Sequence, residues 1–239
     1  LKLETGTARQ GIVREQLSDI LDALTRAEHV NVEGLSTHFA NVEEAHDPRF
    51  ATLQFQRFQE IVQKIRASGF DPRLIHCACS AAIILYPDTH MTMVRAGISL
   101  YGLWPSEEVE TVARKHGIRC DLLPALTWKT RVAQVKSLPV GTPVGYGLTE
   151  TLSKRSRIAV LPVGYFDGYD RRLSGCGEVL IGGYRCKVVG RVCMNMMMVD
   201  VSAVPHVEIE QEVILLGRSG RHSMSADVLA KKIGSISYE

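Results

Sequence analysis

The sequence lacks a run of apolar residues long enough to cross a membrane, and it lacks a charged start followed by an apolar stretch. Neither a membrane span nor a signal peptide is therefore visible. It also lacks an excess of charge of one sign, because 28 basic and 26 acidic residues leave a net charge of +2. With no basic stripe and no acidic tail, we expect a cytoplasmic protein that binds a small molecule and neither nucleic acid nor membrane.

Cysteine is sparse, with six residues in 239, and their spacing matches neither a disulfide framework nor a zinc site. We therefore expect reduced thiols and no bound metal. Apolar residues make up 45% of the chain. That share supports a substantial core, in one large domain or two smaller ones.

The first half of the chain alternates helix and strand patterns. Apolar residues at helical spacing predict a helix over 13–24, and a short apolar run predicts a strand over 34–39. A second helix is predicted between Asp47, which can cap it with Pro48 in its first position, and Gly69, which stops it.

Further strands are predicted over 74–76 and 93–95. Alternating strands and helices imply a parallel sheet with helices outside, and such sheets bind ligands at the carboxyl ends of their strands. His38, His76 and Arg95 all lie near such ends.

Around residue 120 the pattern changes to short strands separated by turn residues. The predicted strands cover 126–135, 157–161, 178–181, 187–189, 197–201 and 212–216. Gly182-Gly183 is typical of a hairpin turn, and a last helix is predicted from a Ser225 cap to Gly234. We therefore expect an α/β domain over 1–119 and a mostly β domain over 120–239.

Three motifs together point to a known family. Arg95 lies in the run Met93-Val94-Arg95-Ala96-Gly97-Ile98-Ser99-Leu100-Tyr101-Gly102-Leu103, Tyr146 lies in Val144-Gly145-Tyr146-Gly147, and the third motif is Arg191-Val192-Cys193-Met194. Read together, they resemble the alanine racemases, isomerases that use pyridoxal 5'-phosphate. The resemblance implies that 1–119 is the C-terminal portion of a cofactor-binding (β/α) TIM-type barrel, and that 120–239 contributes the catalytic tyrosine.

The resemblance also implies a reaction, the interconversion of L- and D-alanine, which supplies D-alanine for peptidoglycan. One base on each face of the α-carbon moves the proton. Tyr146 matches one base, which in the family reaches the site of the partner chain in a homodimer. Arg95 matches an arginine that faces the pyridine nitrogen and leaves it unprotonated, because a guanidinium does not give up its proton.

His38 matches the family histidine that lies between this arginine and the tyrosine. The resemblance gives it the role of bonding the tyrosine and lowering a phenol pKa that is ordinarily near ~10. Taken singly, Arg95 is typical of a surface ion pair, His38 of a structural histidine and Tyr146 of a packed aromatic. The three motifs together favour the catalytic interpretation.

Contacts to the cofactor are implied at several further positions. Ser80, Gly97 and Ile98 match phosphate ligands, which use hydroxyl and amide donors at helix starts, although Ser80 is also compatible with a plain N-cap. Arg9 matches the arginine that contacts the cofactor's phenolic oxygen and the substrate carboxylate. The chain departs from the usual family pattern at Cys79, where asparagine is usual, and at Ala96, where phenylalanine is common.

Substrate contacts are implied at Arg9, at the Met194 amide and at Tyr165. Lys2 matches a lysine that is often carbamylated and then orients Arg9, although an exposed lysine is the alternative interpretation. Asn195 stands where aspartate is common, which removes a negative charge beside the pocket. The substrate range therefore stays open among alanine, serine and a broader set of amino acids.

The family's cofactor lysine lies upstream of the segment that matches Leu1, and another phosphate-binding tyrosine lies downstream of Glu239. We therefore expect an incomplete fragment of a racemase that is inactive alone. A non-catalytic dimerisation or regulatory module is one alternative. A decarboxylase of the same two-domain class is another, although the Gly-Gly-Gly phosphate loop usual there is absent.

Overall fold

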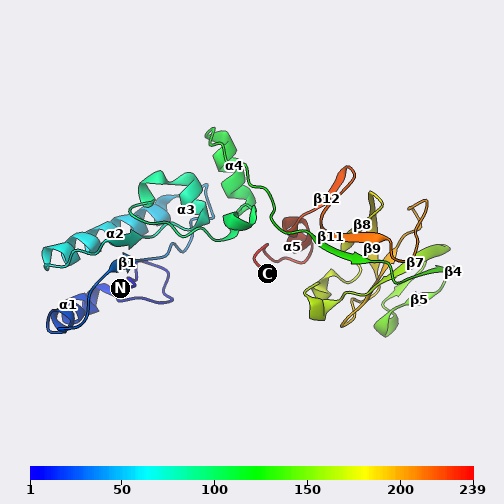
Figure 1. Ribbon diagram of the computed structural model, residues 1–239, viewed down its shortest axis with the longest axis horizontal. Helices are drawn as coiled ribbons and strands as arrows, with labels where there is room; N and C mark the ends of the chain where they lie inside the picture. Colours follow the sequence, from blue (N-terminus) through cyan, green and yellow to red (C-terminus); the bar gives the residue numbers. More distant parts are fainter. The chain divides into compact units, whose positions relative to one another are not determined.

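The computed structural model describes residues 1–239 and divides into two compact units, Leu1–Leu123 and Pro124–Glu239. The N-terminal unit carries helices and short strands, and the C-terminal unit carries a large sheet, as Figure 1 shows for each unit by itself. The α/β class of the first part and the mostly β class of the second part are confirmed. No helix in the chain is both long and apolar enough to cross a membrane.

The N-terminal unit is built on short parallel strands. β1 (Gly34–Ser36) pairs in parallel with β2 (Leu74–His76), and Lys2 forms a parallel bridge to Ser36 on the other side of β1. Its α-helices are α1 (Leu17–Thr25), α2 (Arg49–Ala67), α3 (Ser80–Leu85) and α4 (Glu107–Lys115). Its 3-10 turns are η1 (Arg14–Gln16), η2 (Pro87–Thr89) and η3 (Ile98–Tyr101).

The predicted helix between Asp47 and Gly69 is confirmed as α2. The Asp47 carboxylate accepts a hydrogen bond from the Arg49 amide (3.2 Å), and Gly69 follows the helix end with a φ of +90°. Pro48 takes the N-cap position and not the first helical one, because its carbonyl accepts the first helical bond, from Thr52 (2.9 Å). One face of α2 packs into the core through Ala51, Phe58, Ile61, Val62 and Ile65.

The predicted strand over 93–95 is wrong, because this segment is an extended loop. Thr92 N, just before the segment, donates to Ile75 O of β2 (3.1 Å), and Arg95 N donates to Ala78 O, beyond the end of β2 (2.9 Å). The Ile75 amide donates instead to the Thr92 hydroxyl (2.7 Å), so a side chain takes the place of a strand carbonyl. The strand predicted over 34–39 is shorter than expected, and helix α4 was not predicted.

The C-terminal unit holds an antiparallel sheet of eight strands. Its central path runs β12-β11-β8-β9-β10-β7-β4, and β3 also pairs with β11. The strands are β3 (Trp128–Arg131), β4 (Gln134–Leu138), β7 (Ser156–Leu161), β8 (Glu178–Ile181), β9 (Tyr184–Val189), β10 (Met197–Asp200), β11 (Glu212–Ser219) and β12 (His222–Met224). A separate ribbon pairs β5 (Pro143–Val144) with β6 (Glu150–Thr151).

Local signals in this unit match the sequence closely. Gly182 and Gly183 form the two-residue turn between β8 and β9, with φ values of +56° and +84°. The single strand predicted over 126–135 is instead two strands, because the chain changes neighbours at Val132 and Ala133, whose amides donate to Gln211 and Val160. β3 pairs with β11 before this point, and β4 pairs with β7 after it.

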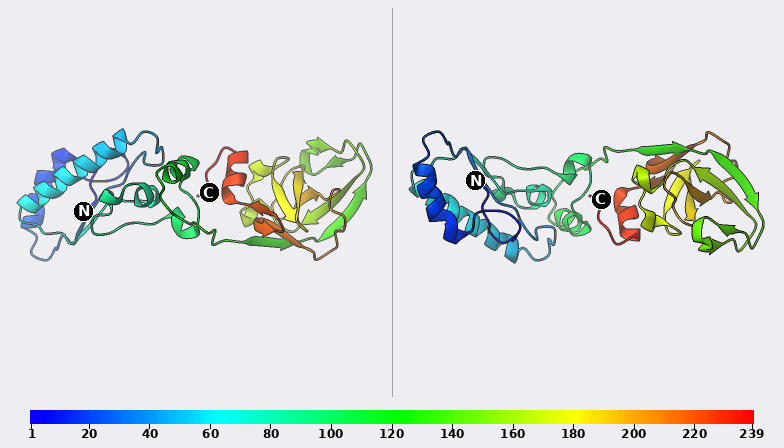
Figure 2. Two further views of the ribbon diagram at one scale, coloured as in Figure 1. Left: turned by 90° about the horizontal axis from the view of Figure 1, so that it is seen from above. Right: turned by 90° about the horizontal axis from the view of Figure 1, so that it is seen from below.

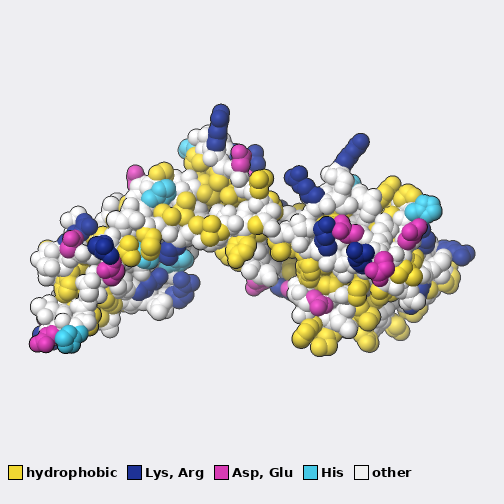
Figure 3. All heavy atoms as spheres, viewed as in Figure 1, with side chains coloured by type: hydrophobic (Ala, Val, Ile, Leu, Met, Phe, Trp, Pro, Cys, Tyr) yellow, Lys and Arg dark blue, Asp and Glu magenta, His cyan; other side chains and the backbone are white.

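The last helix, α5 (Ala226–Lys232), lies at one end of the sheet (Figure 2). Its N-cap is Ser225, whose hydroxyl accepts from the Val228 amide (3.4 Å), and Gly234 follows it at a φ of +65°. Leu229 buries the helix against the core of this unit. Both predicted ends are therefore confirmed. On the face drawn in Figure 3, acidic and basic side chains lie interspersed over the surface.

Candidate active site

Arg95 occupies the carboxyl ends of the two parallel strands in the N-terminal unit. Its guanidinium donates to the carbonyls of Thr37 (2.8 Å), Cys77 (3.1 Å) and His76 (3.2 Å). The carbonyls of Thr37 and Cys77 lie just past the strand ends and have no ladder partner, whereas the His76 carbonyl also accepts from the Thr37 amide (3.3 Å). The planar five-donor fork of arginine can bond several carbonyls at once. The loop carrying Arg95 is in turn tied to Ala78 through its own amide.

Two imidazoles flank the same guanidinium. The Nδ1 atom of His38 lies 3.2 Å from one terminal nitrogen of Arg95, and the Nδ1 atom of His76 bonds the other. A guanidinium only donates, so both Nδ1 atoms act as acceptors and both rings are neutral with the proton on Nε2. Burial, followed by the charge of Arg95, lowers the pKa of both histidines.

No role is assigned to His76 from the sequence, although its place at the end of a predicted strand indicates a candidate site residue. The structure brings it, His38 and Arg95 together in one hydrogen-bonded row. The row requires β1 and β2 to be adjacent and parallel, because each strand delivers one of the histidines to the same edge.

Lys2 and Arg9 add positive charge beside this row. Lys2 is half-buried next to β1, and burial, then Arg95 and Arg9, lower the pKa of its ammonium. Arg9 is exposed and ends a tight loop that is held by Glu4. The Glu4 carboxylate accepts from the amides of Gly6 (2.5 Å) and Thr7 (2.6 Å). Burial raises the pKa of Glu4, but these and neighbouring amides lower it further, so its net pKa is depressed.

A second cluster lies at the start of α3. The buried Ser80 hydroxyl accepts from the amides of Gly97 (2.9 Å) and Ser99 (3.3 Å). Ser80 is the first helical residue and Cys79 is the N-cap, so the N-cap interpretation of Ser80 is wrong. The Ser80 oxygen has two lone pairs, and the two amides occupy them, so its proton stays available to an anionic acceptor. Beside it, Ser99 Oγ is buried without a hydrogen-bond partner.

The C-terminal unit contains a cavity of about 350 Å³. It is lined by Tyr146, Tyr165, Arg171, Arg191, Val192, Cys193, Met194, Asn195 and Met196. Three residues predicted for the site, Tyr146, Tyr165 and Met194, therefore share one pocket. Its two arginines were not predicted as site residues, although Arg191 stood in the quoted motif. Tyr146 is 73% exposed, so its hydroxyl is open to another molecule.

Close backbone approach fixes the Tyr146 turn. Gly190, at a φ of +71°, leaves no room for a side chain, because a Cβ would stand 2.6 Å from the Val144 carbonyl. The Glu150 carboxylate accepts from the Gly190 amide (2.9 Å) and pairs with Lys187 (3.0 Å). These contacts tie β5, which precedes Tyr146, to the segment that enters the pocket wall.

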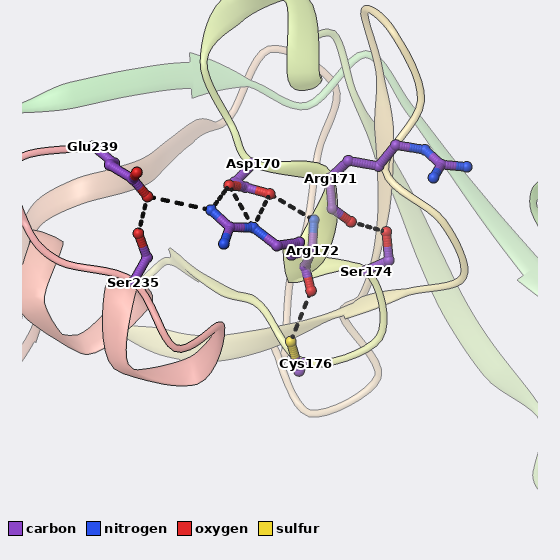
Figure 4. Close-up of polar contacts among 7 residues, drawn as sticks. All are labelled: Asp170, Arg171, Arg172, Ser174, Cys176, Ser235 and Glu239. Atoms are coloured by element: carbon purple, nitrogen blue, oxygen red, sulfur yellow. Dashed lines mark hydrogen bonds and ion pairs between the residues drawn. The ribbon is translucent and has the colours of Figure 1, made fainter.

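The pocket wall at Arg171 is fixed by a polar network. In Figure 4 the Arg171 side chain points away from the group formed by Asp170, Arg172 and Glu239. Asp170 pairs with Arg172 (2.6 Å), and Arg172 also reaches Glu239 (3.4 Å). On the other side, Ser174 Oγ donates to the Arg171 carbonyl (2.5 Å) and accepts from Val192 N (3.0 Å), which joins two walls of the pocket.

Tyr165 and Met194 are joined through their backbones. Tyr165 N donates to the Cys193 carbonyl (3.0 Å), and Phe166 N donates to the Met194 carbonyl (2.9 Å). Gly164 permits this contact, because a Cβ there would lie 2.1 Å from Cys193 O. The structure thus assembles the predicted residues in three groups: Lys2, Arg9, His38 and Arg95; Ser80, Gly97 and Ile98; and Tyr146, Tyr165 and Met194.

Comparison with known proteins gives one consistent family. Residues 1–105 match the family described as alanine racemase, N-terminal domain, and residues 125–239 match alanine racemase, C-terminal domain. Relatives named alanine racemase include that of Symbiobacterium thermophilum, 43% identical over 239 residues, and that of Leptospira interrogans, 37% identical over 240 residues. Each match covers 100% of this chain and 61% of the relative.

Solved structures agree with this comparison. Alanine racemase from Bacillus anthracis with bound L-Ala-P has a TM-score of 0.91 at 34% identity, with 100% of this chain and 60% of that chain covered. The enzyme of the D-cycloserine producer Streptomyces lavendulae has a TM-score of 0.90 at 32% identity, with 100% and 61% covered. The chain therefore spans about three fifths of the length of its relatives, in agreement with the expectation of a fragment.

Proposed function

The chain belongs to the alanine racemase family, and we propose that it forms the larger part of a pyridoxal-phosphate-dependent enzyme that interconverts L- and D-alanine. The observation that carries this proposal is the row in which the Arg95 guanidinium bonds the Nδ1 atoms of His38 and His76. A cation between two neutral imidazoles stabilises negative charge near it without offering an acidic proton. That property suits the removal of an α-proton.

The residues present fit the cofactor's phosphate. Ser80 holds the amides of Gly97 and Ser99 close to its hydroxyl, and the unpartnered Ser99 Oγ lies beside them. Hydroxyl and amide donors at a helix start are suited to a phosphate group. We assign Ser80, Gly97 and Ile98 to phosphate binding, for which the Gly97 amide would exchange its bond to Ser80 Oγ for one to the phosphate. We assign Arg95, His38 and Arg9 to the ring. When bound, the cofactor withdraws electrons from the substrate α-carbon.

In this proposal Arg95 would hold the pyridine nitrogen of the cofactor. Its guanidinium keeps its proton at any physiological pH, and the three carbonyls that it bonds fix its orientation. His38 accepts from Arg95 through Nδ1, which leaves its Nε2–H to donate to the Tyr146 oxygen. A hydrogen bond from this donor would stabilise the phenolate and so favour Tyr146 as a general base.

Tyr146 would act from the partner subunit of a homodimer, and its exposed ring is available for that contact. Arg9 and the Met194 amide would hold the substrate carboxylate, and Tyr165 would line the pocket. Carbamylation of Lys2 would add an anion that orients Arg9. We assign residues 1–119 to the cofactor-binding barrel and residues 120–239 to the domain that supplies the tyrosine.

The substrate is a small amino acid, for which we propose alanine, made into D-alanine in the cytoplasm for peptidoglycan. Asn195 lines the pocket beside Arg171 and Arg191, and no acidic side chain lines it. The lack of a carboxylate there favours a wider substrate range that includes serine.

The test is a racemisation assay of the full-length protein with pyridoxal phosphate and a panel of L-amino acids, analysed by chiral chromatography. We expect L-alanine to reach an equal mixture of enantiomers, with slower conversion of serine. Conversion of no amino acid by a folded, cofactor-loaded protein would contradict the proposal. Release of carbon dioxide from the amino acid would favour a decarboxylase instead.

A further inference from the structure

A fully buried amide lies beneath the candidate site. Gln54, on α2, is 0% exposed, and its side chain points into the N-terminal unit rather than to solvent. Its Nε2 donates to the His38 carbonyl (3.2 Å) and to the Thr5 hydroxyl (3.3 Å), and its Oε1 accepts from the Ala40 amide (2.8 Å). Both polar atoms of this buried amide are therefore paired, as burial requires.

The partners determine which way the amide points. The His38 carbonyl only accepts and the Ala40 amide only donates, so a flipped carboxamide would face a like group at both positions. Gln54 therefore acts as a bridge with one orientation. It reaches from a helix that is fixed by its own buried apolar face.

Gln54 joins the two loops that carry the proposed active-site charges. On one side it holds the carbonyl of His38, which also accepts from the Thr7 hydroxyl (2.6 Å). On the other side it holds Thr5, whose hydroxyl bonds that of Thr37 (2.7 Å), and the Thr5–Thr7 segment leads to Arg9. Both threonines are buried, so this link is shielded from solvent.

We propose that Gln54 is a positioning residue that holds the His38 backbone so that the His38 ring stays against Arg95. It touches neither the reacting atoms nor the phosphate cluster, and it acts through His38. The proposal deepens the proposed function and rests on it only for the effect on turnover. The positioning itself involves only residues of the N-terminal unit.

The charged groups that face His38 make its position measurable. Arg95, Lys2 and Arg9 all lower the pKa of His38, after burial, and the effect of Arg95 depends on the 3.2 Å contact. Without Gln54, only the Thr7 hydroxyl still holds the His38 carbonyl, and we expect the ring to move away from Arg95. The pKa of His38 then rises toward its ordinary value. His76 reaches Arg95 from β2 and has no contact with Gln54, so its titration reports whether the change is local.

The experiment uses the full-length protein labelled at histidine Cε1, and His38→Gln identifies the resonance of His38 by its loss. Gln54→Met is the test variant, because it keeps the length of the side chain and removes all three bonds. Gln56→Met is the matched control, since Gln56 lies on the same helix and is exposed. NMR titration gives both histidine pKa values, and steady-state kinetics give kcat and the cofactor dissociation constant.

We expect Gln54→Met to raise the pKa of His38 by about half a unit or more, a shift of the size that a moved charge contact produces. The pKa of His76 should change less. Turnover should fall by about tenfold or more at an unchanged cofactor dissociation constant, since a displaced catalytic group lowers kcat. Gln56→Met should match the wild type in every measurement.

A folded Gln54→Met protein with the wild-type pKa of His38 would overturn the proposal. If Gln54→Met does not fold, Gln54→Asn decides, because its neutral amide is one methylene too short to span the two loops. An unchanged His38 pKa in that variant would likewise overturn the proposal. If the pKa of His38 moves in the variant, but neither the wild type nor the variant racemises any amino acid, the positioning role stands and the proposed function fails.

Discussion

Replacing Arg95 by methionine tests how the arginine and the two histidines depend on each other. Methionine keeps a flexible, unbranched side chain, although a shorter one, and has neither the charge nor the donors. The carbonyls of Thr37 and Cys77 lose a partner, whereas the His76 carbonyl still accepts from the Thr37 amide (3.3 Å). The Nδ1 atoms of His38 and His76 lose their donor too, but both rings are half-buried and can bond water instead. The cost at pH 8 therefore comes mainly from two carbonyls.

The size of this cost follows from those two bonds. A buried acceptor left without its donor costs roughly 1–3 kcal/mol. Arg95 is only partly buried, so water replaces part of each bond. We therefore expect the free energy of local opening to fall by about 2 kcal/mol at pH 8.

The cost should shrink as the pH falls. Burial, then Arg95, lower the pKa values of His38 and His76, so between their folded values and about 6.5 the unfolded chain binds more protons. Wild-type stability therefore falls with falling pH in this window, by at most about 1.4 kcal/mol per pH unit for each histidine and by less where solvent screens the ring. Without the Arg95 charge, the variant loses less stability than the wild type as the pH falls. We therefore expect the stability deficit of the variant relative to the wild type to be about 1 kcal/mol at pH 5.5.

Hydrogen exchange of the full-length protein measures this locally. Peptides covering 35–40 and 74–79 are followed by mass spectrometry at both pH values, after correction for the intrinsic exchange rate. A deficit that stays constant would mean that the charge of Arg95 does not act on the histidines. A deficit that grows as the pH falls would contradict the assigned neutral rings.

Three further variants test other parts of the site. Ser80→Ala should weaken cofactor binding by about tenfold, about 1.4 kcal/mol, in a fluorescence titration, whereas the exposed Ser68→Ala should not. Glu4→Gln should raise the KM for the amino acid about fivefold with little change in kcat, because the loop held by the carboxylate loosens; an equal loss in kcat would argue for a direct role. Gly190→Ala should lower the free energy of unfolding by about 3 kcal/mol in thermal melts, and Gly141→Ala, at a similar φ in open space, by about 1 kcal/mol.

Much of the fold could be predicted from the sequence, because its local signals are strong. The apolar stripe of α2 and the Gly182-Gly183 turn each specify one local structure. The wrong predictions concern segments whose structure depends on pairing with residues distant in the sequence. The segment 93–95 has a strand-like composition, but a Thr92 hydroxyl replaces the strand carbonyl. The interruption at Val132 depends on strands more than twenty residues away.

The site could be predicted in part, for a related reason. Motif residues such as Arg95 and Tyr146 stand in recognisable strings, so the resemblance located them. His76, Glu4 and Gln54 have no such string, and their partners are known only once β1, β2 and α2 are folded together. A glutamine at a position of the otherwise apolar face of the predicted helix is the one sequence signal that Gln54 offers.

The central claim is that Tyr146 is the base for one face of the substrate, and single-turnover exchange in deuterium oxide tests it most directly. Tyr146→Phe removes only a hydroxyl from a side chain that is 73% exposed, so the fold should be kept. We predict that loss of the α-proton from one enantiomer of alanine slows by roughly 10²–10⁴-fold, while loss from the other changes far less. Equal slowing from both enantiomers, or no slowing from either, would contradict the account.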